Sequence, residues 1–221
     1  MMILNDAADI RLGADTVEAV YLGEDKVWPS GGDYTQIDWI QATGTQYIDT
    51  GYTQQSDSVK IEIFSHIYGG SAIFYAGNIG ACMAWAGAVY VYYPELYRNG
   101  SRTWIQAGGH DPYGDSAEYL LTLILNPSTC SISDGVTTNS TSGGDASVNA
   151  TPYCLFADCT GETPDRFIQA RIMHCKIYDG GTLVRDFVPV IRNADSKPGL
   201  WDDVTQQFYT NAGTGEFVVP T

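Results

Sequence analysis

The sequence predicts an all-β protein built as a two-sheet antiparallel sandwich. Short runs with alternating apolar and polar residues recur along the chain, and turn signals separate them at intervals of about 8–12 residues. No stretch shows the roughly 3.6-residue period of a capped helix. Composition agrees, because 24 glycines and 15 tyrosines accompany only 17% charged residues, a profile typical of strands and turns.

Residues 1–29 predict a small β unit ahead of the sandwich. The expected strands are 9–13, 17–22 and 27–29. Strands this short bury too little apolar surface to fold alone, so we expect the unit to pack on another body and to serve in attachment or oligomerisation. Residues 30–33 are Ser-Gly-Gly-Asp and predict a flexible linker.

The main domain is expected to span residues 34–221. Residues 59–67 alternate, with apolar side chains on one face, and predict a half-buried antiparallel strand. Residues 119–125 are almost continuously apolar and predict a strand that is buried on both faces. The polar stretch 137–151 is expected to be a loop.

The C-terminal part is divided by turn signals whose glycines supply positive φ. We expect turns at Asp179-Gly180-Gly181, Lys197-Pro198-Gly199 and Asn211-Ala212-Gly213. Strand-like runs flank each of them, so the segment predicts successive hairpins.

Several of these motifs resemble one known family. The runs H-C-K-I-Y-D-G-G-T-L-V-R-D-F-V-P (174–189), G-L-W-D (199–202) and F-Y-T-N-A-G-T-G-E-F (208–217) are similar to the C-terminal half of concanavalin A-like (laminin-G-like) jelly-roll domains of phage and prophage virion proteins. T-G-T-Q-Y-I-D-T-G (43–51) resembles the opening strand of that family. The resemblance implies a jelly roll in which the first and last strands are neighbours.

Three further residues match the family pattern and are interpreted as structural. We expect Arg185 and Asp186 to form a packed ion pair and Pro189 to lie at a strand end. In the N-terminal unit, V-x-x-V-Y-L-G-x-x-K-V-W (17–28) resembles a small module placed ahead of lectin-like domains in phage tail and virion proteins.

The resemblance implies a non-enzymatic phage or prophage virion protein, in a tail fibre, head fibre or capsid surface. Its lectin-like domain would adhere to host-surface glycans or decorate the capsid or tail. We expect a homo-oligomer, since avidity compensates for weak sugar sites, with other virion proteins bound through the N-terminal unit. The expected location is the virion, assembled in the host bacterial cytoplasm. The alternatives are a bacterial carbohydrate-binding module and a purely structural decoration protein without a ligand.

Aromatic residues concentrate where the family pattern fades. Trp85, Tyr90, Tyr92 and Trp104 are candidates for a glycan platform, because the C–H faces of sugar rings stack on aromatic rings. Core packing and a protein interface use the same residue types, so these two alternatives stay open.

Enzymatic chemistry is not expected. Sandwich glycosidases need a pair of carboxylates beside the scissile bond. In the strand that is the best candidate, Glu62 is the acidic residue, and Phe64 and His66 occupy the next positions on its face.

No cofactor is expected, although a loop could hold calcium. Asp111 and Asp115 are weak candidate ligands, and the Asp202-Asp203 pair is another. Calcium takes about six to eight oxygen ligands, and neither cluster supplies many. Aspartates that stabilise turns are the favoured interpretation.

Charge argues against nucleic-acid binding. The net charge is −15, and the 11 Lys and Arg residues are scattered rather than clustered. Residues 1–6 lack the features of a secretory signal, and no apolar run approaches the roughly 20 residues that cross a bilayer, so we expect no membrane insertion.

The five cysteines fit no zinc pattern. They are Cys82, Cys130, Cys154, Cys159 and Cys175. We expect buried free thiols, and the odd count favours assembly in a reducing cytoplasm.

Overall fold

A computed structural model describes the backbone of most of the chain. The described residues are 11–12, 15–16, 20–22, 25–28, 33–70, 72–76, 79–86, 89–98, 101–104, 118–133, 135, 138–142, 152–159 and 163–221. Side chains are described for 33–68, 118, 120–129, 131–133, 135, 138–140, 152–159 and 163–221.

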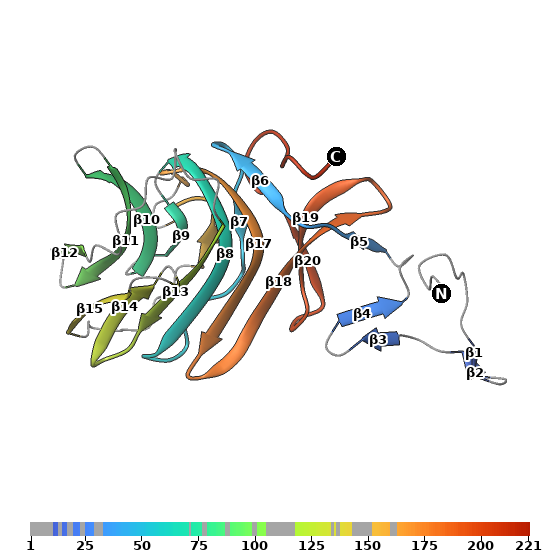
Figure 1. Ribbon diagram of the computed structural model, residues 1–221, viewed down its shortest axis with the longest axis horizontal. Coiled ribbons are helices and arrows are strands. Elements are labelled where there is room, and N and C mark those ends of the chain that lie inside the picture. The colour runs from blue at the N-terminus through green and yellow to red at the C-terminus, as the bar shows by residue number, and fades with distance from the viewer. Residues whose placement is uncertain are drawn as a thin grey trace.

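Two antiparallel sheets form the body of the molecule (Figure 1). The large sheet has the order β15 (Thr138–Ser142), β14 (Thr129–Ser133), β13 (Tyr119–Leu125), β8 (Val59–Gly70), β17 (Ile168–Asp179), β18 (Thr182–Arg192), β19 (Lys197–Asp202) and β20 (Gln207–Thr210). Two more strands join it, since β5 (Tyr34–Gln36) pairs with β18 and β6 (Ile40–Thr43) with β17. The smaller sheet has the order β12 (Ser101–Trp104), β11 (Val89–Arg98), β10 (Ile79–Ala86), β9 (Ala72–Ala76), β16 (Cys154–Leu155) and β7 (Ile48–Asp49).

This arrangement is the all-β two-sheet jelly-roll sandwich that the sequence predicts. Its first and last segments are neighbours, because Gln41 in β6 exchanges backbone hydrogen bonds of 2.8 and 3.0 Å with Val218. The part of the chain that the structure describes contains no helix that is long and apolar enough to span a membrane.

In the described residues of the N-terminal unit there are four short strands, where the sequence predicts three. They are β1 (Arg11–Leu12), β2 (Asp15–Thr16), β3 (Val20–Leu22) and β4 (Asp25–Trp28). They form two separate two-stranded sheets, β1 with β2 and β3 with β4. Residues 30–32 lie outside the described residues, and the division of the chain at residue 34 stays a prediction.

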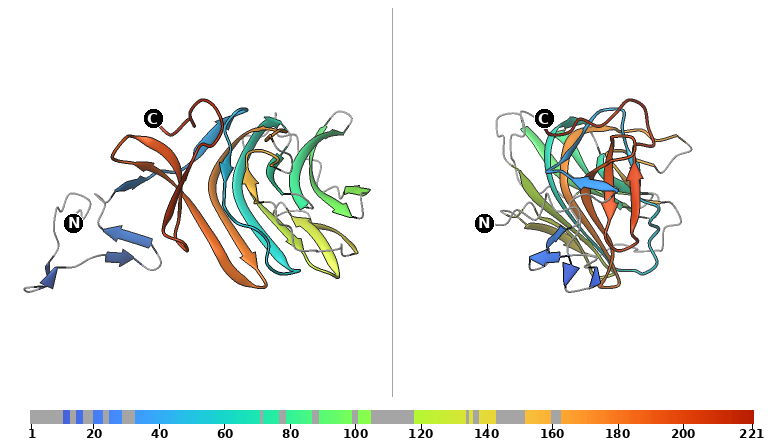
Figure 2. Two further views of the ribbon diagram at one scale, coloured as in Figure 1. Left: turned by 180° about the vertical axis from the view of Figure 1, so that it is seen from behind. Right: turned by 90° about the vertical axis from the view of Figure 1, so that its right-hand side faces the viewer.

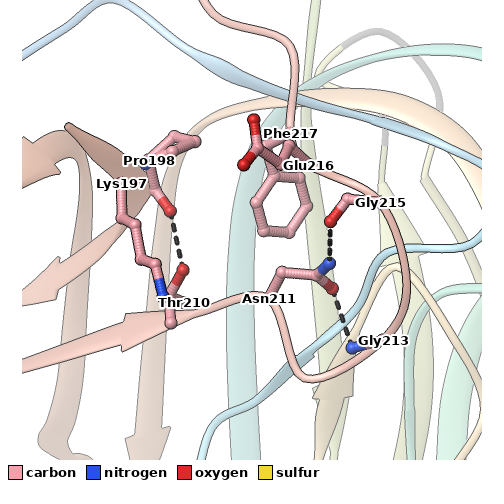
Figure 3. Close-up of a pocket in the computed structure, with 8 residues that line it drawn as sticks. All are labelled: Lys197, Pro198, Thr210, Asn211, Gly213, Gly215, Glu216 and Phe217. Carbon is pink, nitrogen blue, oxygen red and sulfur yellow. Dashed lines mark hydrogen bonds between the residues drawn. The ribbon is translucent and has the colours of Figure 1, made fainter. Parts of the chain in front are cut away.

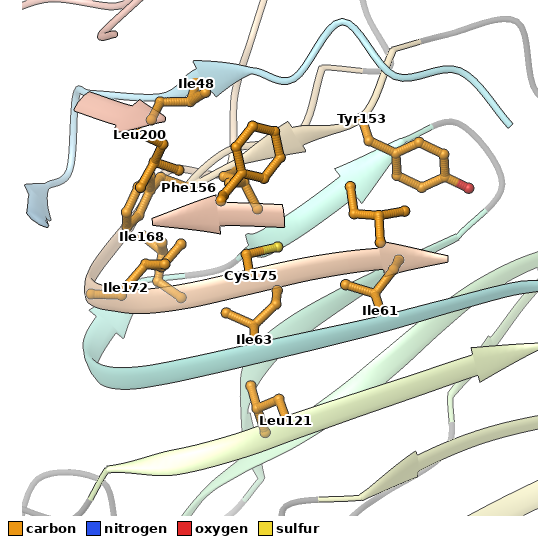
Figure 4. Packing of buried hydrophobic residues seen from close by; sticks show 14 of the residues in the cluster. Ile48, Ile61, Ile63, Leu121, Tyr153, Phe156, Ile168, Ile172, Cys175 and Leu200 are labelled. Carbon is orange, nitrogen blue, oxygen red and sulfur yellow. The ribbon is translucent and has the colours of Figure 1, made fainter. Parts of the chain in front are cut away.

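The core lies between the two sheets and is built from alternate residues of the long strands (Figure 4). In β8, Val59, Ile61, Ile63 and Ile67 are each at most 2% exposed, which confirms the predicted alternation. The opposing sheet contributes buried residues from β7 and β16, and Tyr153 and Phe156 flank β16.

Two predicted segments differ from the structure. Leu121, Leu123 and Leu125 of β13 are buried, but Leu120 is 47% exposed, so β13 is buried on one face and not on both. The expected loop 137–151 contains strand β15, whose Ser and Thr residues pair with β14 at the sheet edge.

The central pair β8 and β17 contains two β-bulges. Ile172 pairs with Ser65 and His174 with Phe64, so Met173 is an extra residue in β17. Ala170 pairs with Ile67 and Gln169 with Gly69, so Tyr68 is an extra residue in β8. Bulges re-aim side chains, and here Met173 and His174 are both partly exposed between the buried Ile172 and Cys175.

The C-terminal hairpins correct one predicted turn. Gly180 and Gly181 have φ of +55° and +83° and form the expected turn between β17 and β18. Residues 197–199 instead belong to β19, and the turn lies at residues 193–196. Gly199 is needed for close strand approach, because a Cβ there would overlap the carbonyl oxygen of Tyr209.

The predicted Arg185–Asp186 ion pair is wrong. Successive residues of a strand lie on opposite faces, so the two side chains diverge. Arg185 Nε lies 3.4 Å from Asp202 Oδ2, whereas Asp186 contacts His174 and Lys176.

Pro189 lies inside β18 rather than at its end. Pairing with β17 ends at Phe187 and pairing with β5 begins at Val190, so the missing N–H of proline falls between the two ladders. The carbonyl of Pro189 accepts a hydrogen bond of 3.0 Å from the Ile37 N–H.

Two buried aspartates fix the ends of the hairpins. Asp202 is 0% exposed and accepts hydrogen bonds from Asp186 N–H (2.8 Å), Val204 N–H (3.1 Å) and the Thr205 hydroxyl (2.6 Å). This confirms its interpretation as a turn residue. Asp179 is 8% exposed and accepts hydrogen bonds from the Tyr52 hydroxyl (2.8 Å) and Gln55 N–H (2.7 Å).

The cysteines correct another expectation. Cys154 and Cys159 form a disulfide, whereas free thiols were expected, and Cys175 is a buried free thiol as predicted. Burial raises the pKa of the Cys175 thiol, and the nearby Asp186 and Asp202 add to the effect. The disulfide closes a short loop in which Phe156 has a φ of +71° and is fully buried. The side chains of Cys82 and Cys130 lie outside the described part.

Asp202→Ala is expected to lower the free energy of unfolding by about 3–5 kcal/mol, because it leaves Arg185 and three donors without their buried acceptor. Urea unfolding followed by circular dichroism measures the change. Asp195→Ala is the control, since the exposed Arg192–Asp195 pair is screened by solvent and its loss changes stability little. Equal losses in the two variants would contradict the assigned role.

The surroundings of Asp179 lead us to expect that the free energy of unfolding depends on pH. Burial alone raises the pKa of its carboxyl, but hydrogen bonds from Ser56, Gln55 and Tyr52 outweigh burial and lower the pKa. The group therefore stabilises the fold above its unfolded pKa of about 4, and this contribution is lost as the pH falls through the lower folded value. Unfolding curves between pH 7 and 2 are expected to show a smaller acid-induced loss for Asp179→Asn than for the natural chain.

Removal of the disulfide by Cys154→Ala with Cys159→Ala is expected to cost about 2 kcal/mol, because the closed loop is short. Thermal unfolding measures the cost, and intact mass under non-reducing conditions verifies the bond. Reduction is expected to lower the melting temperature of the natural chain and to leave the double variant unchanged. An equal response of both proteins to reductant would show that the bond is absent in solution.

Candidate functional site

The outer face of the large sheet, which faces away from the core, carries a groove beside the two bulges. This Trp39 groove has a volume of about 720 Å³. Its lining residues are Gln36, Ile37, Asp38, Trp39, Phe64, Glu118 and Met173. They come from the end of β5, from the segment that joins β5 to β6, from β8 and β17, and from the residue that precedes β13. The strands β13, β8 and β17 are consecutive neighbours in the large sheet (Figure 2).

The lining has a less exposed apolar part, called the floor, and an exposed polar part, called the rim. Trp39, Phe64 and Met173 are partly exposed, and Ile37 extends the apolar surface. Gln36, Asp38 and Glu118 are exposed. A few polar groups around an apolar floor are typical of a small-ligand site.

Trp39 is held in place from the side of β17. The Arg171 guanidinium lies 3.9 Å from the centroid of the Trp39 ring and 5.5 Å from that of Tyr68. Arg171 Nε donates a 2.9 Å hydrogen bond to Gln41 Oε1. Arg171 does not line the groove, so it supports the indole from outside the lining.

A row of charged residues continues the site along the same face. His174, the register partner of Phe64, lies 2.5 Å from Asp186 through Nε2, and Lys176 Nζ lies 3.4 Å from the same carboxylate. Burial would raise the pKa of Asp186, but hydrogen bonding and charge from His174 and Lys176 lower it. Glu62 pairs with Lys60 at 2.9 Å. These charges are satisfied within the face.

The described residues contain no group of three or more His, Cys, Asp or Glu residues placed to hold a metal. The expected calcium ligands Asp111 and Asp115 lie outside the described residues, so calcium binding stays a prediction.

A second pocket of about 170 Å³ lies at the C-terminal turn (Figure 3). The Asn211 side chain beside it is occupied by internal bonds, because Oδ1 accepts from Gly213 N–H at 2.8 Å and Nδ2 donates to the Gly215 carbonyl at 2.8 Å. Thr210 Oγ1 donates to the Pro198 carbonyl at 2.8 Å. These bonds close the predicted turn at 211–213, and the pocket is a by-product of that turn.

The predicted glycan platform lies in the smaller sheet. Trp85 pairs with Tyr90, Met83 with Tyr92, and Glu95 with Trp104. By this register, Tyr90 and Tyr92 occupy one set of alternate positions with Trp85, and Trp104 belongs to the other set. The side chains of these residues lie outside the described part, and the platform stays a prediction.

The Trp39 groove itself is absent from the sequence-based candidates. Phe64 shares the outward face of its strand with Glu62, which is a usable signal. The sequence gives no sign that Met173 faces outward. Strict alternation along β17 predicts one outward residue between Ile172 and Cys175, whereas the bulge places both Met173 and His174 there.

No family model and no curated protein matches the sequence. Solved structures that match include the native heptameric SAP-like pentraxin of Limulus polyphemus, at 9% sequence identity and a TM-score of 0.41. The match covers 64% of this chain and 70% of the pentraxin chain.

Proposed function

We propose that this protein is a non-enzymatic, lectin-like virion protein of a phage or prophage that binds glycans in the Trp39 groove. The groove carries the proposal. Sugars present apolar C–H faces and polar hydroxyl groups together, and the groove offers Trp39 and Phe64 in its floor with amide and carboxylate oxygens at its rim.

The arrangement of carboxylates favours binding over hydrolysis. A glycosidase needs one carboxyl group that stays protonated, which burial or a neighbouring charge provides. Asp38 and Glu118 are both exposed at the rim, and Asp186 has a lowered pKa and faces His174 rather than the groove floor. A surface that binds and releases a glycan unchanged agrees with this arrangement.

The virion assignment rests on the sequence motifs at 17–28, 43–51 and 174–217. In this proposal the strands β1 to β4 attach the protein to other virion proteins, and several copies present their grooves together so that weak sites gain avidity. The Cys154–Cys159 disulfide suits a protein that works outside the cell, and it would form after release from the reducing cytoplasm. A decoration protein without a ligand is the alternative class.

Trp39→Ala is expected to reduce glycan binding about tenfold or more, because it removes the main stacking surface of the groove. A glycan array identifies a ligand, and calorimetry with that ligand measures affinity. Trp201→Ala is the matched control, since Trp201 is a partly exposed tryptophan whose ring centroid lies 4.7 Å from that of Tyr34 and which does not line the groove.

A combined Trp85→Ala and Trp104→Ala variant separates the groove from the platform predicted in the smaller sheet. Loss of binding in that variant, with retention in Trp39→Ala, would assign the ligand to the platform instead. Absence of any glycan ligand would favour the decoration protein. Mass spectrometry of particles purified from the induced source strain tests the virion location, and absence of the chain from those particles would refute it.

A further inference from the structure

We infer that the Trp39 groove selects saccharides that carry a free amine, such as oligosaccharides of glucosamine, over neutral and anionic ones. The inference rests on the proposed function, since it specifies the ligand of the same groove. It rests on the two rim carboxylates, Asp38 and Glu118, which form no ion pair with the described residues.

Asp38 and Glu118 differ from most carboxylates of this face. Glu62 and Asp186 have cationic partners, at 2.9 Å and within 3.4 Å respectively. Neither Asp38 nor Glu118 forms an ion pair or a side-chain hydrogen bond with any residue that the structure describes. Both line one groove, so an occupant meets two carboxylates that no residue in the described part of the chain neutralises.

The floor of the groove adds a preference for the same kind of ligand. A cation close to an aromatic face is attracted by the ring quadrupole, and Trp39 and Phe64 both line the groove. Arg171 contributes one positive charge against Trp39 from outside the groove lining, which leaves the rim net negative. A sugar amine therefore gains from the carboxylates while the ring stacks on the floor.

The same charges reject acidic saccharides. A uronate or sialate would bring its carboxylate toward Asp38 and Glu118. Among the described cations of this face, Lys60 and Lys176 pair with Glu62 and Asp186, and Arg171 contacts Trp39 without lining the groove. The net charge of −15 acts in the same direction at longer range. A neutral N-acetylated sugar keeps the stacking and lacks the charge attraction.

Calorimetry on the full chain tests the inference with three oligosaccharides of equal length, made of glucosamine, N-acetylglucosamine and glucuronic acid. At low salt and a pH at which the amine is charged, the glucosamine ligand is expected to bind about 3–10-fold more tightly than the N-acetylated one. The uronate is expected to bind most weakly. High salt is expected to reduce the preference.

Asp38→Asn with Glu118→Gln is expected to abolish the preference, so that the glucosamine and N-acetylglucosamine ligands bind with equal affinity. Asp165→Asn with Glu216→Gln is the control, since both residues are exposed and neither lines the groove. Spermidine, a cation without a sugar ring, is expected to compete poorly.

Equal affinities for the charged and N-acetylated ligands would overturn the inference, as would a preserved preference in the Asp38 and Glu118 variant or displacement by spermidine at similar concentration. Trp39→Ala distinguishes a failure of this inference from a failure of the proposed function. If that variant binds every saccharide as the natural chain does, the groove is not the glycan site and the proposed function fails with it.

Discussion

The pairing of β8 with β17 is the constraint on which the rest of this molecule depends. Each strand has 12 residues, and each is paired on both of its edges. Side chains alternate between the two faces of a sheet, so Ile61, Ile63, Ile172 and Ile177 fill the core. The residues between them are left for the outer face.

The groove follows from two departures from that pairing. A strictly alternating β17 would place either Met173 or His174 on the outer face, and the bulge places both there. Met173 then lines the apolar floor, and His174 reaches Asp186 on β18. The second bulge places Tyr68 against Arg171, which supports Trp39. The two bulges therefore change which side chains reach the outer face, while buried residues continue to fill the core on either side of them.

The sequence predicts the fold better than the site because the two depend on different information. Periodicity identifies β8 from Val59 and Ile61, and turn glycines place the hairpin at Gly180. Contacts between distant segments are not visible in this way. In the sequence Asp202 stands beside Asp203 as a possible calcium-ligand pair, but in the structure it is fully buried and lies beside Arg185. Trp39 becomes part of a groove only when β6 pairs with β17.

Two pairs of acidic residues in the described part contrast in their surroundings. Asp179 and Asp202 are buried and accept hydrogen bonds from backbone N–H and hydroxyl groups at turns. Their carboxylates are therefore engaged within the fold. Asp38 and Glu118 are exposed, and their side chains form no hydrogen bond or ion pair with the residues that the structure describes. An exposed carboxylate on a sandwich surface usually serves solubility. Two of them around an aromatic floor create a local potential that a neutral protein of the same shape would lack, and a site that distinguishes charged from uncharged sugars needs that difference.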